Sequence, residues 1–301
     1  MNEKVIKSYK GFDKDMKCRD FQYEVGKEYN MDGEIKCCKQ GFHACKSPLE
    51  VWDYYDMLNS RFAEVEQSGK IDEEEKSTKV CSSHIKIKAE LKLADIINIG
   101  VEWLKDITSP SKVKADGVLN DNGDRRKQIG SSGDSAQIGS SGDSAKIGSS
   151  GDSAKIGSSG YSAKIGSSGY SAQIGSSGYS AKIGSSGDSA KIGSSGDSAK
   201  IGSSGYSAQI GSSGDSAKIG SSGDSAKIDS TGEDSVIMCA GNKSKAKAKI
   251  GSWITLAEWE WSDKKKRDVP VCVKTEYVDG QNIKADTWYQ LKNGNFVEVT
   301  E

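Results

Sequence analysis

The stretch CCKQGFHACKSP, residues 37–48, brings together the side chains with the most obvious chemistry. Thiols and imidazoles bind zinc, and a thiolate beside an imidazole is a nucleophile. Zinc ligands usually pair at C-x2-4-C spacing, which neither Cys37-x7-Cys45 nor His43-x-Cys45 has. A Cys45–His84 nucleophile pair would need a third, orienting group that the sequence does not place. We therefore expect no metal here and interpret the thiols as small buried hydrophobic residues.

A nine-residue repeat, I-G-S-S-G-(D/Y)-S-A-(K/Q), places Ile at every ninth position from Ile129 to Ile228. Calcium-binding β-rolls put Asp at another position relative to Gly, and here Tyr replaces Asp in four of eleven copies. Ice-binding solenoids present ranks of Thr, whereas this repeat has Ser. Mimicry of DNA needs strong net acidity, but seven Asp against eight Lys leave the repeats near neutral. We expect none of these three activities.

Two interpretations of the variable slots stay open. In the first, Tyr dilutes and stacks between like charges, and the Asp and Lys columns offset each other. In the second, the slots form an exposed stripe that binds a partner. The candidate partner-binding residues are Tyr161, Tyr170, Tyr179, Tyr206, Asp134, Asp143, Asp152, Lys155 and Lys164.

The strict period favours a parallel β-solenoid over a flexible linker. Gly/Ser-rich segments are usually linkers, but a linker does not need Ile at every ninth position. A solenoid does, because it stacks one residue type on itself in every coil. We predict two repeats, 18 residues, per coil. Within a repeat we expect a strand over 153–156 with Ala154 and Ile156 inside, and a corner over 157–160 in which Gly adopts positive φ.

The predicted fold class is mostly β, in three parts. Residues 1–116 form an N-terminal α+β domain, residues 117–250 the solenoid with degenerate end coils, and residues 251–301 a small C-terminal β capping module. In this module Asp279-Gly280 and Asn293-Gly294 suit hairpin turns. We expect its tryptophans to cover the last coil: Trp253, Trp259, Trp261 and Trp288. A basic loop is either a solvated hairpin tip or a contact for phosphate or an acidic partner: Lys264, Lys265, Lys266 and Arg267.

Four elements are predicted in the N-terminal part. Residues 79–93 alternate as a long strand, and LADIINIGVEWLKDI, which follows, has helical spacing. Residues 47–58 begin with Ser47 as a helix N-cap and Pro48 at the first helical position. Residues 61–71 read as a strand that runs into a glycine turn.

Three segments, YKGFDKDMKCRDFQYEVGKEY, CKQGFHACKSPLEVWDYY and RFAEVEQSGKID, together with the tail after residue 250, resemble an uncharacterised domain family of bacteriophages and prophages. In that family an N-terminal domain of this kind is often followed by Gly/Ser/Ala repeats. The resemblance covers about half the chain. It implies a phage or mobile-element origin and brings no known activity.

SYKGF, GFHACKSPLEVWDYY and RFAEVE are also somewhat similar to ADP-ribosyltransferase domains, which place a basic residue, a His or Ser, and a later Glu on successive elements. The resemblance makes Lys10, His43 and Glu66 the candidate catalytic residues, with Glu64 as an alternative to Glu66. The early Arg and the Ser-Thr-Ser strand of one branch are missing. We therefore lean towards a domain that is not an enzyme.

Composition narrows the functional classes. Charge is balanced, with 42 basic and 43 acidic residues, so there is no global attraction to nucleic acid or anionic membrane. No stretch approaches 18 apolar residues, and the N-terminus lacks the apolar core of a secretory signal. Seven cysteines, an odd number, are interpreted as reduced thiols. The expected location is the cytoplasm of an infected or lysogenic bacterial host.

The expected function is a non-enzymatic binding or scaffold protein, a rigid solenoid that presents Tyr, Asp and Lys ladders to a macromolecular partner. The expected partner is a host or phage protein complex; nucleic acid is the alternative, a homo-oligomer is left open, and no membrane, cofactor or metal is expected. Phage origin suggests an inhibitor of a host defence system, by association alone. The alternatives are a virion or surface-adhesion protein and an ADP-ribosyltransferase-like enzyme.

Overall fold

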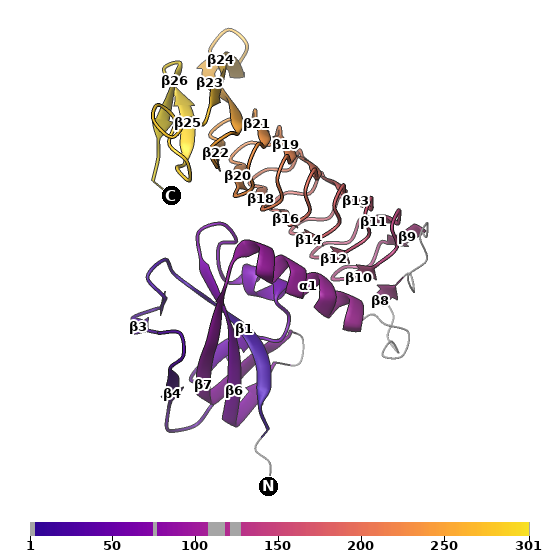
Figure 1. The fold of residues 1–301 in the computed structure, drawn as a ribbon, viewed down its shortest axis with the longest axis vertical. Coiled ribbons are helices and arrows are strands. Elements are labelled where there is room, and N and C mark those ends of the chain that lie inside the picture. The colour runs from indigo at the N-terminus through magenta and orange to yellow at the C-terminus, as the bar shows by residue number, and fades with distance from the viewer. Residues whose placement is uncertain (1–3, 75–76, 108–117, 121–127, 301) are drawn as a thin grey trace. The chain divides into compact units, whose positions relative to one another are not determined.

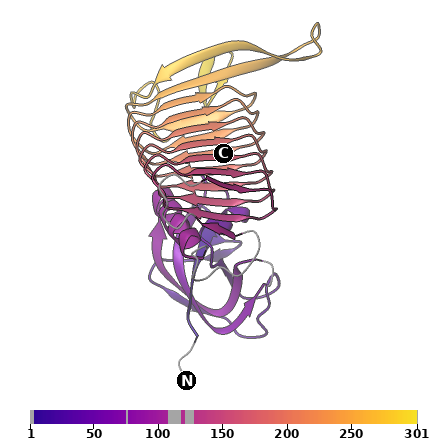
Figure 2. The same cartoon turned by 90° about the vertical axis from the view of Figure 1, so that its right-hand side faces the viewer.

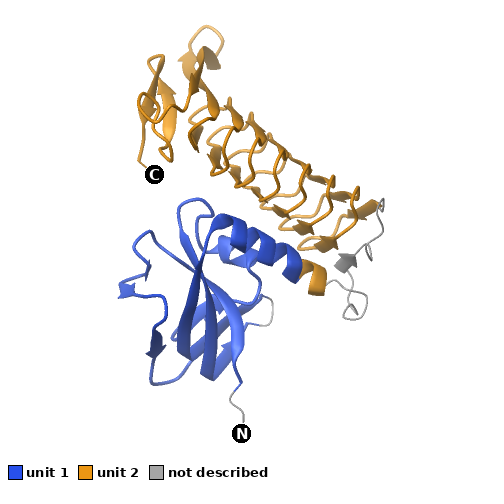
Figure 3. Ribbon diagram, viewed as in Figure 1, with its two compact units in different colours: residues 1–103 blue, residues 104–301 orange. Residues whose placement is uncertain are grey.

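The computed structural model describes residues 4–74, 77–107, 118–120 and 128–300, with the side chains of 118–120 left out. As predicted, the protein is mostly β, with 48% strand and 7% helix. The chain divides into two compact units, residues 1–103 (unit 1) and residues 104–301 (unit 2) (Figure 3). No helix in the described ranges is long and apolar enough to cross a membrane.

Unit 1 is built around a small closed antiparallel barrel (Figure 1). Strand β1 (Ile6–Phe12) pairs with β6 (Arg61–Glu73), and β6 pairs with β7 (Lys79–Leu91). Strand β5 (Phe42–Cys45) closes the ring between β7 and β1, and β4 (Glu28–Asn30) also pairs with β7. The pairing of β7 with β6 closes the ring, and the residues of β1 from Ser8 to Phe12 are all buried.

The remaining elements of this region are short, apart from one helix. Strands β2 (Lys17–Cys18) and β3 (Phe21–Gln22) form a hairpin, and α1 spans Leu93–Ile107. The predicted long strand and the helix that follows it are confirmed by β7 and α1. Strand β6 continues through Gly69 (φ 77°) with an irregular register, where the sequence predicted that a turn would end it.

The predicted helix over residues 47–58 is wrong. The structure has only a 3-10 helix, η1 (Leu49–Asp53), and the Ser47 hydroxyl does not cap it. The first four residues of η1 are buried, including the Glu50 carboxylate, which accepts hydrogen bonds from Thr78. Contacts on every side, rather than one apolar stripe, therefore set the conformation of this segment.

Unit 2 is a parallel β-solenoid of about seven turns, whose successive strands alternate between two sheets (Figure 2). The repeats of the even sheet are β8 (Val118–Asn120), β10 (Gln137–Ser140), β12 (Lys155–Ser158), β14 (Gln173–Ser176), β16 (Lys191–Ser194), β18 (Gln209–Ser212), β20 (Lys227–Ser230) and β22 (Lys245–Ala248). Those of the odd sheet are β9 (Gln128–Ser131), β11 (Lys146–Ser149), β13 (Lys164–Ser167), β15 (Lys182–Ser185), β17 (Lys200–Ser203), β19 (Lys218–Ser221) and β21 (Val236–Cys239). Each sheet is completed by strands of the C-terminal region, given below.

The isoleucines stack as predicted. In the odd sheet Ile165 pairs with Ile183, and in the even sheet Ile156 pairs with Ile174, so that each coil contains two repeats. These side chains form one continuous apolar column inside the coil. The prediction of 18 residues per coil is confirmed.

The predicted boundaries within the repeat are wrong by two residues. The strand is Lys155–Ser158 rather than 153–156, so Ser158 lies inside the coil instead of at a corner. Ala154 and Ile156 are inside, as predicted. The residue with positive φ is Ser153 (φ 55°), the serine after the variable slot, and not a glycine.

The second glycine of each repeat serves close packing between coils. A Cβ on Gly169 would lie 2.0 Å from the carbonyl oxygen of Gly151, the equivalent residue one coil earlier. Successive corners therefore approach more closely than any side chain allows. The first glycine of each odd-sheet strand, such as Gly184, faces open space.

The variable slot forms ladders along the two lines of corners. The Asp152 carboxylate accepts a hydrogen bond from the backbone N–H of Tyr170 in the next coil (2.8 Å). The rings of Tyr161 and Tyr179 stack, with centroids 5.3 Å apart. The stacked rings are one contact that the first interpretation requires; the offset between the Asp and Lys columns and partner binding at these residues stay predictions.

The C-terminal strands continue both sheets. In the odd sheet β23 (Trp253–Ser262) stacks on β21 and forms a hairpin with β24 (Arg267–Tyr277). In the even sheet β22 pairs with β25 (Tyr289–Lys292), which forms a hairpin with β26 (Asn295–Glu298). Leu291 and other buried residues of this region belong to the same apolar core as the isoleucine column.

The expectations for this region are partly met. Asn293 (φ 51°) and Gly294 (φ 69°) form the predicted hairpin turn, whereas Asp279 and Gly280 lie in a loop whose backbone N–H groups bond to the Asp279 carboxylate. Trp288 is buried and Trp259 donates a hydrogen bond to the carbonyl of Ala240. Trp253 and Trp261 do not cover the last coil; their exposed fractions are 47% and 61%. The predicted degenerate first coil lies, apart from β8 and the start of β9, outside the described residues.

Candidate functional site

Unit 1 contains a cavity of about 700 Å³. It is lined from β1, from the segment around β2 and β3, from β5 and from the residues after η1. Its aromatic lining residues are Tyr9, Phe21, Tyr23, Phe42, Tyr54 and Tyr55. Its basic lining residues are Lys10, Arg19, Lys39 and Lys79, against a single acidic one, Asp20. We call this space the basic cavity.

Lys10 is the most buried charged residue of the basic cavity. Its exposed fraction is 3%, and its ammonium donates a hydrogen bond to the carbonyl oxygen of His43 (3.0 Å). The ammonium also lies over the rings of Phe12 and Tyr23, at 5.5 and 5.4 Å from their centroids. Burial lowers the pKa of Lys10, because an ammonium is less stable away from water, and the thiol of Cys18 opposes that shift.

The imidazole of His43 lies beside Lys10 in the same cavity. Its Nε2 accepts a hydrogen bond from the backbone N–H of Cys38 (3.0 Å). Burial lowers the pKa of His43, and the charge of Lys10 lowers it further. Both effects favour the neutral imidazole.

A thiol and a phenol also line the basic cavity. The Sγ of Cys18 and the phenolic oxygen of Tyr55 are 3.0 Å apart. Burial raises the pKa of Tyr55, so its hydroxyl stays protonated. The ring of Tyr55 fits because residue 11 is glycine: a Cβ on Gly11 would lie 2.4 Å from that ring.

The structure brings together two of the three candidate catalytic residues. Lys10 and His43 share the basic cavity, whereas Glu66 does not line it and pairs with Lys88 (3.0 Å). Glu64 pairs with Lys7 (2.8 Å) instead. Neither candidate glutamate therefore lines the cavity beside Lys10 and His43.

Of the other thiols, those of Cys37 and Cys81 lie close together. Among the described residues, no group of three or more His, Cys, Asp or Glu side chains is placed to hold a metal ion. Cys37 donates to the carbonyl of Asp72, while Cys45 pairs in register with Lys79 and His84 with Asn30. Cys45 and His84 therefore do not form a nucleophile pair.

Cysteine alkylation offers a check on the environments in unit 1. We expect iodoacetamide to modify Cys38 much faster than Cys81, because Cys38 is exposed while Cys81 is buried, and burial raises the pKa of the Cys81 thiol to about 12. Peptide mass spectrometry after a timed reaction measures both rates. Equal modification of the two thiols in the folded protein would contradict this description.

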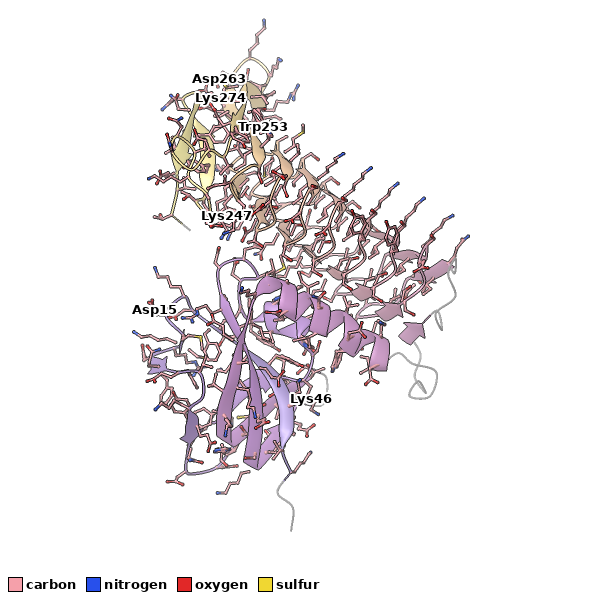
Figure 4. The ribbon with its side chains drawn as sticks, viewed as in Figure 1. Asp15, Lys46, Lys247, Trp253, Asp263 and Lys274 are labelled. Atoms are coloured by element: carbon pink, nitrogen blue, oxygen red, sulfur yellow. The ribbon has the colours of Figure 1, made fainter. Side chains whose placement is uncertain are left out.

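The outer face of the odd sheet is a second candidate site. One lysine per strand points outward in five consecutive strands, and a row of nitrogen-tipped side chains follows this sheet in Figure 4. We call these residues the lysine ladder: Lys146, Lys164, Lys182, Lys200 and Lys218. All five are exposed, and within the described part of the chain none of their side chains has a hydrogen bond or an ion pair.

On the even sheet, the strand position that carries the lysine ladder on the odd sheet does not hold lysine in every strand. In the even sheet it alternates between amide and ammonium through six strands: Gln137, Lys155, Gln173, Lys191, Gln209 and Lys227. The sequence signal for this asymmetry is that the three glutamines recur every 36 residues, which is two coils. The ladder was missed because the repeats were considered as equivalent units.

A groove of about 880 Å³ runs along the lysine ladder. Its floor is the first glycine of each odd-sheet strand: Gly130, Gly148, Gly166, Gly184 and Gly202. A Cβ at any of these glycines would meet no atom within 4 Å, so the groove is open to an extended ligand.

The predicted partner-binding residues do not form one surface. Tyr161, Tyr179 and Asp143 follow even-sheet strands, whereas the other Tyr and Asp candidates follow odd-sheet strands. Lys164 belongs to the lysine ladder and Lys155 to the even sheet. The predicted basic loop lies at the tip of the hairpin between β23 and β24, where Lys266 is 3.8 Å from the Asp263 carboxylate.

Comparisons with known proteins reach only unit 1. No curated protein and no solved structure matches the chain. Residues 6–99, which include β1 to β7 and all residues of the basic cavity, match the family model described as "Domain of unknown function (DUF7666)". The chain thus contains a DUF7666 domain over residues 6–99.

Proposed function

We propose that this protein is a non-enzymatic binding scaffold whose lysine ladder docks an extended acidic segment of a protein partner. The observation that carries the proposal is the unbroken run of lysines on the odd sheet beside the Lys/Gln alternation on the even sheet. The glycine groove beside the ladder supplies the space for the partner's chain.

The cost of the ladder supports a role in binding. Strands in a sheet are about 4.8 Å apart, and two like charges 4 Å apart in water repel by on the order of 1 kcal/mol. Glutamine at alternate strands relieves that repulsion on the even sheet. Keeping lysine at five consecutive strands of the odd sheet is therefore unfavourable for the isolated solenoid, and an acidic ligand would offset this repulsion.

The dimensions favour a polypeptide over duplex nucleic acid. Each strand has four residues and spans about 13 Å at 3.3 Å per residue. Columns of acidic corner residues, including Asp188 and Asp197, border the sheets and would repel the phosphates of a ligand broad enough to reach them. An extended peptide is narrow enough to lie on the ladder alone.

The wider biological setting is part of the proposal. We place the protein in a phage or prophage and its partner in a host or phage protein complex, with inhibition of a host defence system as the role and a virion or surface-adhesion role as the alternative. The seven cysteines, all free thiols, suit a reducing cytoplasm.

A charge-matched pair of triple variants tests the docking face. The first replaces Lys164, Lys182 and Lys200 with Gln, the residue that the even sheet itself uses; the control replaces three lysines at the hairpin tip with Gln: Lys264, Lys265 and Lys266. Three exposed ion pairs at roughly 0.2–1 kcal/mol each sum to about 0.6–3 kcal/mol. Binding of a fluorescent oligoglutamate peptide should therefore weaken about 3- to 150-fold in the ladder variant only.

Fluorescence anisotropy at low salt measures both affinities, and circular dichroism checks that both variants keep the β spectrum. An equal loss of affinity in the two variants would mean that overall charge, not the ladder, attracts the peptide. Tighter, ladder-dependent binding of an oligothymidylate of the same length would reassign the face to nucleic acid.

A further inference from the structure

The ammonium of Lys10 has no opposite charge within the described structure. It forms no ion pair with a carboxylate; it donates a hydrogen bond to the uncharged carbonyl of His43 and also interacts with the thiol of Cys18. The ionisable groups with the largest influence on it are the thiols of Cys18 and Cys45 and the guanidinium of Arg19. A buried ammonium normally has a carboxylate partner, because a buried charge without one is costly.

The other basic groups of the cavity already have an acidic partner or are exposed to solvent. Lys79 is 3.3 Å from the Glu74 carboxylate and lies over the ring of Tyr54. Arg19 and Lys39 are exposed. The buried charge that an anion in the cavity would compensate is therefore that of Lys10. Arg19 and Lys39 lie nearer to solvent.

The size and walls of the cavity narrow the ligand further. A volume of about 700 Å³ lies within the range of small-molecule sites and is far too small for a folded partner. Phe21, Tyr23 and Phe42 form an aromatic cluster with ring centroids 4.8–6.4 Å apart. Aromatic side chains of this kind pack against planar rings.

We propose that the basic cavity of the DUF7666 domain binds a small organic phosphate or carboxylate that carries a planar ring, with its anionic group beside Lys10. The proposal concerns unit 1 alone and does not depend on the lysine ladder. The ring packs among the aromatic side chains, and the anion supplies the charge that Lys10 lacks.

Binding should be linked to protonation of Lys10. Burial lowers the pKa of this amine in the free protein, and an anion beside it raises that pKa again. His43, Cys18, Cys45 and Arg19 also face this space. Asp20 is the one carboxylate among the described lining residues, and it forms no ion pair with Lys10. Ligand binding should therefore take up protons and should weaken as the pH rises.

Matched ligands test the role of the charge. The probes are phenyl phosphate and adenosine 5′-monophosphate, and the controls are phenol and adenosine, which carry the same rings without the anion. Isothermal titration calorimetry of the full chain in buffers of different ionisation enthalpy measures affinity and proton uptake together. We expect at least one phosphate to bind, its uncharged control to bind at least tenfold more weakly, and protons to be taken up.

Matched variants test the residue. Lys10→Met removes the ammonium and keeps an unbranched side chain, and Lys7→Met is the control on the same strand, because Lys7 is exposed and pairs with Glu64 outside the cavity. Lys10→Met loses a hydrogen bond to a charged group, so its phosphate affinity should fall about 10- to 150-fold. Lys7→Met should bind phosphate as the natural chain does. Without ligand, Lys10→Met should melt at a higher temperature than the natural chain, since a buried uncompensated charge is gone.

Some outcomes would overturn the proposal. The first is that neither phosphate binds even at about 10 mM, a concentration at which a specific site should be occupied. The second is that the natural chain and Lys10→Met bind phosphate with equal affinity. A lower melting temperature of Lys10→Met would assign Lys10 a structural role. Lys10→Gln serves as the second variant if Lys10→Met does not fold, and unchanged oligoglutamate binding in either variant separates this site from the lysine ladder.

Discussion

Replacing Gly187 with alanine is expected to destabilise the solenoid by about 3 kcal/mol or more. The new Cβ would lie 1.9 Å from the carbonyl oxygen of Gly169, and side-chain atoms essentially never approach backbone closer than 3.0 Å. The obstacle is backbone, which cannot rotate away as a side chain can, so the two coils must separate. Overpacking alone typically costs 1–3 kcal/mol, and separation also breaks inter-coil hydrogen bonds such as Ser186 to Ser167.

Gly184→Ala is the matched control, three residues earlier in the same repeat. A Cβ on Gly184 would meet nothing within 4 Å, and its φ is not positive. Alanine in a strand avoids the conformational entropy cost of glycine, so this variant should be neutral or more stable by up to about 1 kcal/mol. The same chemical change is thus expected to have opposite effects at two glycines of one GSSG motif.

Thermal melting followed by circular dichroism measures the difference. For a unit of this size, 3 kcal/mol corresponds to a fall of roughly 6–12 °C in the melting temperature. Because long repeat arrays can unfold in parts, limited proteolysis should also show cleavage near residue 187 in the Gly187→Ala variant. Equal melting temperatures for the two variants would be incompatible with the close stacking of the corners.

Asp229→Asn is expected to gain about 3 kcal/mol of stability relative to the natural chain as the pH rises from about 4 to about 7. Asp229 stands on the even sheet where the neighbouring strand has Gly211, and it is buried. One carboxylate oxygen is 3.1 Å from the Lys247 ammonium, and the other has no hydrogen-bond partner in the described structure. Burial raises the pKa of Asp229 from 3.8 to about 6, although Lys247 lowers it in part.

The direction follows from proton binding. The folded chain holds the proton of Asp229 more tightly than the unfolded chain, so unfolding releases a proton between about pH 4 and about pH 6. The contribution of Asp229 to stability is therefore greatest below pH 4 and is lost as the pH rises through 6. A shift of about two pKa units corresponds to about 3 kcal/mol, and an asparagine has no such dependence.

Urea unfolding of both chains at several pH values measures this difference, since other titrating groups contribute equally to both. Asp263→Asn is the control, because Asp263 is exposed at the hairpin tip of the same unit. Lys247, labelled in Figure 4, supplies a second check: Lys247→Met leaves the buried carboxylate unpaired and should be strongly destabilising at pH 7. A constant difference between Asp229→Asn and the natural chain across this pH range would contradict the assignment.

The two proposed binding sites should respond differently to solution conditions. The lysine ladder is an exposed periodic surface, so its affinity should depend strongly on salt. Lys10 is buried and nearly shielded from salt, so ligand binding in the basic cavity should depend on pH instead. Each site can be removed by substitutions that leave the other intact.

The sequence by itself determined the stacking of the solenoid. Isoleucine at every ninth position allows two repeats per coil, and the small residues between leave no other way to form a core. The same local rules predicted β7 from its alternation and the Asn293-Gly294 turn from its residue types. These features depend on neighbours in the chain, which the sequence displays directly.

Tertiary structure decided which residues share a face. Nine letters per repeat do not reveal that Gln137 and Gln173 lie on one sheet and Lys146 and Lys164 on the other, because that assignment depends on where the coil bends. The same holds for Gly184 and Gly187, which are equivalent in composition but face solvent and the next coil respectively.

The basic cavity also required the fold. Lys10 and His43 became candidates through a resemblance, but their contact joins residues that are 33 positions apart in the chain. Nothing in the sequence indicates that Cys18 meets Tyr55. Glu66, on the neighbouring strand β6, lies outside the cavity because successive residues of a strand point to opposite faces. The sequence by itself determined which side chains repeat along the solenoid. Closure of the barrel and bending of the coil determined which side chains meet, because these two features bring together residues that no local pattern relates.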